Sequence, residues 1–201
     1  MGLLSSSGTF VRFSVEGELP ENIWEFAAER IAANAFKDID DNYEEYSIGW
    51  VSVMNMFDSG FTYASHAVGD YIVLSMRIDE RKISGAVLKK YCMKEEERVK
   101  KEKQVPKLSR GQRLEIKENI KLMLTRKADP IPAVYDLCWN LANNTVLFFS
   151  TSAKVHVALE DLFKETFGLH LVLQVPYLAA AHLLGPEQEA ALAAMDSSIL
   201  L

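Results

Sequence analysis

The first part of the chain alternates between apolar and polar residues in a way that predicts strands around one helix. Residues Thr9–Val15 place every second side chain on an apolar side, which is typical of a half-buried β-strand. Over Glu21–Phe36 the apolar residues recur at helical spacing, so a helix laid on a sheet is expected there. Further strands are predicted over Gly49–Val53, Tyr71–Arg77 and, more briefly, Phe61–Ala64, because residues typical of turns separate these segments.

The middle of the chain predicts a helix that loses its apolar face. This helix begins at Ser84, but its apolar stripe almost disappears after Met93 and leaves only Val99 before the break at Pro106. A helix that continues without a buried face is expected to leave the body of the protein and to project into solvent.

A second helix is predicted directly after this break. Ser109 and Gln112 have the spacing of a capping box, in which each side chain hydrogen-bonds the backbone N–H of the other residue. Apolar residues from Ile116 to Leu124 line one face of the helix, and the segment Asp129–Pro132 is expected to end it. The two helices together predict an antiparallel hairpin that is rooted in the core.

The strand pattern returns after the hairpin. Strands are predicted over Tyr135–Leu141 and Val146–Phe149, which a tight Asn-Asn turn joins. A helix with apolar residues at helical spacing follows and ends at Gly168, and the last strand covers Leu169–Val175. The alanine-rich tail is expected to form a short helix over Pro186–Met195.

These elements predict an α+β fold of antiparallel sheets flanked by helices, with a projecting basic helical hairpin. The order strand, strand, helix, strand in the last third is not a repeating βαβ pattern. A chain of 201 residues is long enough to bury one sizeable core. We therefore divide the chain into a first part of the body at residues 1–83, the hairpin at 84–132, and a second part of the body with its helical tail at 133–201.

The charges of the chain are distributed very unevenly. The net charge of the whole chain is −6, which taken alone argues against a nucleic-acid partner. The segment Lys89–Lys127, however, holds fourteen Lys and Arg residues against six Glu, and so carries +8. The rest of the chain therefore carries −14. Such a division suggests an element that faces a polyanion on a body that repels one.

We expect the hairpin to bind the phosphate backbone of duplex DNA. The stretch Arg98–Arg113 holds seven basic residues and one acid. A solvated helix that Lys–Glu pairs stabilise does not require such an excess of basic residues. Gln104, Gln112 and Asn119 do not share a helix side, so readout of bases is not expected. The predicted DNA-binding residues are Lys89, Lys90, Lys94, Arg98, Lys100, Lys101, Lys103, Lys107, Arg110, Arg113, Arg126 and Lys127.

Several short motifs follow one another between Ser47 and Pro176. They are Ile48-Gly49-Trp50-Val51, Ser65-His66, Tyr71-Ile72-Val73-Leu74, Arg77, Lys82-Ile83, Val87-Leu88-Lys89, the strand Tyr135–Asn140, Ser152-Ala153-Lys154 and Leu173-Gln174-Val175-Pro176. In this order, and around a charged helical hairpin, they resemble the family of the bacterial recombination-associated protein RdgC. The shared order over more than half of the chain carries the resemblance, because no single motif decides it.

The resemblance implies a nucleoid-associated protein that binds double-stranded DNA with little sequence preference and restrains strand exchange driven by RecA. It also implies a ring-shaped homodimer with a basic inner surface, in which the hairpin is the family's finger. This chain has Arg126-Lys127-Ala128 where the family has Arg-x-Phe at the end of the finger. The family also runs about a third longer. The resemblance therefore implies DNA binding but leaves the closed ring open.

Two other functions remain open from the residues themselves. A metal-dependent exonuclease needs carboxylates that converge on two divalent ions about 4 Å apart. The densest acids occur in one predicted loop, and they are Asp38, Asp40, Asp41, Glu44 and Glu45. A protein-interaction module would use the charged hairpin to bind an acidic partner or to form a coiled coil. Residues Lys94–Lys103 provide almost none of the apolar heptad positions that a coiled coil requires.

Other kinds of site find little support in the sequence. Cys92 and Cys138 are expected as reduced core thiols, and the four histidines lie too far apart for paired metal ligands. The longest apolar runs are too short to cross a bilayer, and the first residues lack the features of a secretory signal. We therefore expect a cytoplasmic, nucleoid-associated protein that is not an enzyme and that uses no cofactor, metal, membrane or small-molecule substrate.

Overall fold

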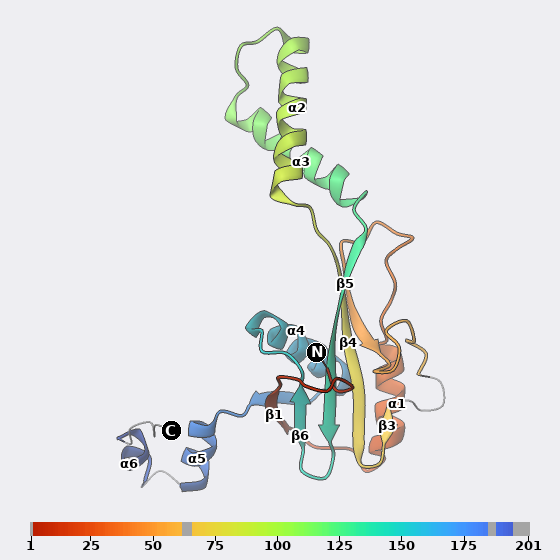
Figure 1. Ribbon diagram of the computed structural model, residues 1–201, viewed down its shortest axis with the longest axis vertical. Helices are drawn as coiled ribbons and strands as arrows, with labels where there is room; N and C mark the ends of the chain where they lie inside the picture. Colours follow the sequence, from red (N-terminus) through yellow and green to blue (C-terminus); the bar gives the residue numbers. More distant parts are fainter. Residues whose placement is uncertain (1, 62–65, 185–187, 195–201) are drawn as a thin grey trace.

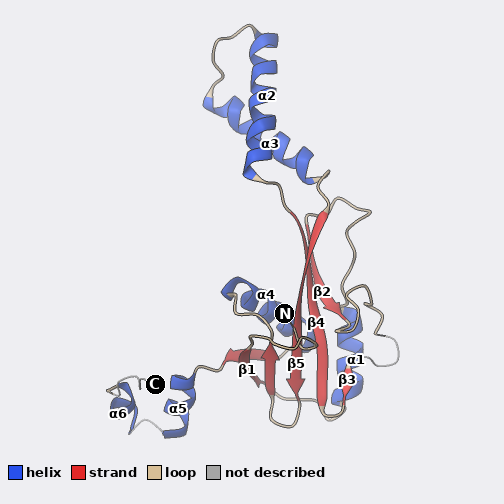
Figure 2. Ribbon diagram, in the orientation of Figure 1, coloured by secondary structure: helices blue, strands red, loops and turns tan. Residues whose placement is uncertain are grey.

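A computed structural model describes residues 2–61, 66–184 and 188–194. One large sheet forms the body, with helices against it, and two further helices lie beyond its end (Figures 1 and 2). The elements are, in chain order, β1 (Val11–Glu16), α1 (Ile23–Ala33), β2 (Tyr46–Val51), β3 (Ala67–Val68), β4 (Tyr71–Arg81), α2 (Gly85–Lys103), α3 (Arg110–Thr125), β5 (Pro130–Asn140), β6 (Thr145–Phe148), α4 (Ala153–Phe167), β7 (His170–Leu173), α5 (Pro176–Leu184) and α6 (Glu189–Ala193).

The described strands form a seven-stranded antiparallel sheet. Its order is β2-β4-β5-β6-β1-β7, and β3 pairs with β4. The longest pairing joins β4 and β5 from Tyr71–Asn140 to Arg81–Pro130, whereas β6 pairs with β5 only over Leu137–Asn140. One end of the β4–β5 ribbon therefore extends beyond β6 and leads into α2 and α3 (Figure 1). The predicted α+β class is confirmed, with one sheet in place of several.

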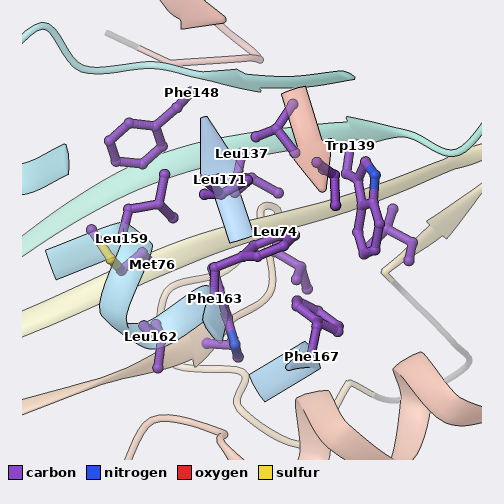
Figure 3. Packing of buried hydrophobic residues seen from close by; sticks show 14 of the residues in the cluster. Leu74, Met76, Leu137, Trp139, Phe148, Leu159, Leu162, Phe163, Phe167 and Leu171 are labelled. Carbon is purple, nitrogen blue, oxygen red and sulfur yellow. The ribbon is translucent and has the colours of Figure 1, made fainter. Parts of the chain in front are cut away.

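The hydrophobic core lies between the sheet and the helices α1 and α4. Trp139 of β5 packs against both Phe163 and Phe167 of α4, with ring centroids 5.2 Å apart in both pairs (Figure 3). The indole N–H of the fully buried Trp50 donates a 2.8 Å hydrogen bond to Thr166 Oγ1. Alternate residues of the strands reach this layer, as the period-two pattern of the sequence predicts.

The second helix ends earlier than the sequence predicts, and β5 begins within the segment that is expected to end it. The segment Asp129–Pro132 does not end that helix, because α3 ends at Thr125 and β5 begins at Pro130. Arg81, the partner of Pro130, donates its backbone N–H to Glu45 O on the other side of β4. Two directly opposed residues of an antiparallel pair point their N–H groups either both toward each other or both away. The backbone nitrogen of Pro130 therefore points away from β4, and the proline removes no hydrogen bond between β4 and β5. Pro132 lies two residues further and has the same orientation.

The tail also differs from the expectation. The hydrophobic pattern does not predict α5, although Pro176 at its first position and the alanines that follow both favour a helix. The helix α6 falls within the predicted Pro186–Met195, of which residues 186, 187 and 195 lie outside the described residues. Residues 62–64 of the short strand predicted over Phe61–Ala64 also lie outside them.

Candidate nucleic-acid interface

The helices α2 and α3 lie against each other and are joined by residues 104–109. Figure 1 shows that α3 crosses α2 obliquely, whereas the sequence predicts an antiparallel hairpin. No residue of α2 is buried, and α3 buries only Ile116 and Thr125. Both helices therefore expose most of their side chains, and together they carry eleven of the 22 Lys and Arg residues of the chain.

Caps define the ends of both helices. Ser84 Oγ accepts the backbone N–H of Val87, and α2 ends at Gln104 in a left-handed conformation. The backbone N–H of Gln112 donates to Ser109 Oγ at 3.2 Å, and the N–H of Ser109 donates to Gln112 Oε1 at 2.9 Å. This arrangement confirms the predicted capping box. The last turn of α2 holds Lys100, Lys101 and Lys103, where positive charge stabilises a helix.

The structure places the predicted DNA-binding residues on exposed surface. Eleven of the twelve are exposed, and Lys100 is half-buried. Seven of the twelve lie on α2, Lys107 lies on the connection, and Arg110 and Arg113 begin α3. Arg126 and Lys127 follow the end of α3. The twelve thus form a larger group on the helix pair and a smaller group near its junction with the sheet.

Arg98 differs from the other residues of the larger group. Its guanidinium forms ion pairs with Glu95 at 2.5 Å and with Glu102 at 2.6 Å. The hydrogen bond from Arg98 lowers the pKa of the Glu95 carboxyl, and the same bond raises the pKa of Arg98. A phosphate would have to compete with both carboxylates for this guanidinium, so Arg98 is a weaker candidate than its neighbours.

The smaller group lies next to the acidic loop, which we define as residues 38–45. The Arg126 guanidinium lies 5.5 Å from the centroid of the Tyr43 ring, a distance typical of a cation–π contact. Arg81 of β4 fixes this loop by donating to the backbone oxygens of Ile39, Asn42 and Glu44, and it also donates to that of Ala128 after α3. The carboxylates of the loop therefore offset the positive potential of Arg126 and Lys127.

One acid of the loop, Asp38, takes part in local structure. Asp38 Oδ1 accepts the backbone N–H of Asp40 at 2.8 Å, and Asp38 Oδ2 lies 3.8 Å from the Arg77 guanidinium. Within residues 2–61, 66–184 and 188–194, no group of three His, Cys, Asp or Glu residues is placed to hold a metal ion.

The structure also shows a basic residue that is not among the twelve predicted from the sequence. Lys117 of α3 lies beside Lys89, Arg110 and Arg113 along a groove between the two helices. Glu115 and Glu118 lie close to Lys117 in the sequence, so a count of charges along the chain does not single out Lys117. Its helical position, four residues after Arg113, is the signal that could have found it.

A sequence model of one family, described as "Putative exonuclease, RdgC", matches residues 13–182 of this chain. The chain belongs to the RdgC family. The match confirms the resemblance seen over Ser47–Pro176 and extends it at both ends, so that it covers the sheet and the helix pair. The RdgC family is recombination-associated. A search of curated proteins finds no match to this chain. None of the described helices has both the length and the apolar character needed to cross a membrane.

Proposed function

We propose that this RdgC-family chain binds the backbone of double-stranded DNA with α2 and α3, without sequence preference. The observation that carries the proposal is the number of basic residues on this helix pair that have no acidic partner. Within the described part of the chain, Arg98 is the only one of the twelve predicted residues whose side chain lies within 4.0 Å of a carboxylate. The other eleven are available to replace the counterions that condense on DNA.

The proposed consequence is an effect on homologous recombination. A protein that covers duplex phosphates competes with any other protein that needs the same duplex. Membership of a recombination-associated family supports the proposal that this chain limits the access of RecA to DNA. Binding without sequence preference would also associate the protein with the nucleoid. A homodimer would present two helix pairs and would raise the affinity by linking two binding events.

Binding through phosphates predicts a strong dependence on salt. If about five to eight Lys and Arg side chains contact phosphates, the logarithm of the association constant falls against the logarithm of salt concentration with a slope of about −4 to −7. A mobility-shift titration of a plain duplex at several salt concentrations measures this slope. A slope near zero would contradict the backbone mode, and equal affinities for duplexes of different sequence are expected alongside it.

We also propose that the chain acts without catalysis. The carboxylate of Asp38 accepts a hydrogen bond within the acidic loop and lies near Arg77, and this supports a structural role for it. The family description makes exonuclease activity the alternative to be measured. End-labelled duplex incubated with the chain and magnesium ions is expected to keep its label. Loss of label that Asp40→Ala abolishes would contradict the proposal.

A further inference from the structure

The crossing of α2 and α3 leaves a groove on one side of the helix pair. We call it the α2–α3 groove, and its volume is about 580 Å³. This volume lies within the range of about 300–1,000 Å³ that is usual for sites that bind small ligands. The floor of the groove is apolar, since it is lined by Leu88, Cys92 and Leu114. Leu114 is 55% exposed, so the floor is open to an occupant.

The walls of the groove are basic. Lys89 of α2 and Arg110, Arg113 and Lys117 of α3 line it, and Glu96 is the one acid among its lining residues. The described residues include no ion-pair partner within 4.0 Å for any of these four basic side chains. The walls of this groove therefore favour an occupant that carries negative charge.

The start of α3 adds to this positive potential. Arg110 is the first residue of the helix and Arg113 the fourth, and the first turn contains no acid. The exposed N–H groups of a helix N-terminus carry partial positive charge, so basic residues there destabilise the free helix and attract an anion. An anionic ligand would relieve this unfavourable arrangement.

Cys92, on the floor of the groove, is half-buried. Burial raises the pKa of the Cys92 thiol, Glu96 raises it further, and Lys117 lowers it. The side chains of both helices therefore act on one partly desolvated position between them. A purely ionic ligand leaves such a floor uncovered, because apolar surface gains free energy only when an apolar group covers it.

Duplex DNA does not match a groove that has basic walls and an apolar floor. Its phosphates lie on a wide convex surface, and they offer nothing apolar to Leu88 or Leu114. A peptide presents carboxylates and apolar side chains a few ångströms apart on one flexible strand. We propose that the α2–α3 groove binds an acidic peptide segment of a partner protein, whose carboxylates contact the four basic residues and whose bulky apolar side chain covers the floor.

The peptide and DNA would share part of their binding surface. Lys89, Arg110 and Arg113 line the groove and also belong to the predicted DNA-binding residues. If the proposed DNA binding holds, an acidic partner would displace DNA from this side of the helix pair. The occupancy of the groove would then control how much DNA the chain covers.

The test uses two exposed leucines of the same helix. The probe is a fluorescein-labelled peptide with aspartates on both sides of a Leu-Phe pair, and fluorescence anisotropy measures its binding to the full chain. Leu114→Ser alters the floor of the groove, whereas Leu122→Ser changes a leucine that is 47% exposed and lies outside it. Leu114→Ser is expected to weaken peptide binding about tenfold, as the loss of one leucine-sized apolar contact implies. Leu122→Ser is expected to leave it unchanged.

Two controls separate the peptide from DNA. A peptide with serines in place of the Leu-Phe pair is expected to bind weakly, and Leu114→Ser is expected to leave the affinity for plain duplex unchanged. If the serine peptide binds as tightly, or if Leu114→Ser has no effect, the groove attracts anions by charge alone and the inference is overturned. Failure of the peptide to bind the folded chain would overturn it too. Because peptide binding is measured without DNA, the inference and the proposed DNA binding fail independently.

Discussion

Replacing Lys100, Lys101 and Lys103 by Glu is expected to weaken the binding of plain duplex DNA by a factor on the order of 10²–10³ near 0.1 M salt. Each phosphate contact contributes roughly 0.9 to the slope of log K against log salt, so three lost contacts remove about three decades at most. The slope itself is expected to become shallower by about 3. The three residues lie in the last turn of α2, where substitution disturbs no buried side chain. Mobility-shift titrations at several salt concentrations measure both quantities.

The control for this experiment changes the same charge elsewhere. Lys37, Lys154 and Lys164 are exposed residues of the body, and their replacement by Glu alters the net charge by the same amount. If DNA binds the helix pair, this second variant is expected to lose much less affinity than the first. Equal losses in the two variants would show that only the total charge matters. That outcome would refute the helix pair as the binding site.

Asp79→Ala is expected to lower the free energy of unfolding by about 3 kcal/mol, because it leaves a buried guanidinium without its main partner. Arg77 donates to both carboxylate oxygens of Asp79, at 2.8 and 2.6 Å, and both side chains are almost fully buried. The Arg77 guanidinium also lies 4.2 Å from the centroid of the Phe36 ring, which keeps water away from it. Asp38 remains 3.8 Å away and compensates part of the loss. Urea denaturation of the two proteins measures the difference.

Two further variants test the physical reason for this loss. Glu80→Ala removes the partner of Lys82 in a partly exposed ion pair at the end of the same strand, and is expected to cost less than about 1 kcal/mol. Arg77→Met combined with Asp79→Leu removes both buried charges, and is expected to be less destabilising than Asp79→Ala alone. If Asp79→Ala costs no more than Glu80→Ala, the buried pair does not hold this part of the fold together.

The sequence predicts well those elements whose signals are local. The capping box depends on two residues three positions apart, and both of its hydrogen bonds are present. The alternation in Thr9–Val15 and the helical spacing before Gly168 correspond to β1 and α4. The patterns of β1 and α4 are visible in the sequence because one face of each element packs against the core.

The polar face of β4 could not be predicted in the same way. Arg77, Asp79 and Arg81 occupy every second position at the end of β4, which is typical of a solvated strand face, yet all three are buried. Irregular loops cover this face, and backbone oxygens of those loops accept hydrogen bonds from the two arginines. Loops without periodicity give no signal of where they lie. The one available clue is the Arg-x-Asp-x-Arg spacing, which places opposite charges next to each other on one side of a strand.

The candidate site was predictable in composition but not in geometry. Counting charges identifies the segment that holds the basic residues and predicts the twelve DNA-binding residues within it. The count cannot show that Arg98 is held by two carboxylates, or that Lys117 lies beside Arg113 along the groove. Both facts depend on the spatial neighbours of each side chain, and the second also on the oblique crossing of α2 and α3. Such a crossing is set by side chains that pack between helices, which a single sequence does not reveal.

The pairing of Arg81 with Pro130 has a consequence for the ancestry and engineering of the fold. The chain leaves β4 and re-enters β5 at two directly opposed positions, so everything between them is an insertion at the tip of a β-hairpin. A two-residue turn could join the same two strands. Evolution could therefore lengthen, shorten or exchange the inserted helices without rebuilding the body, and a protein engineer could graft a different element at the same point.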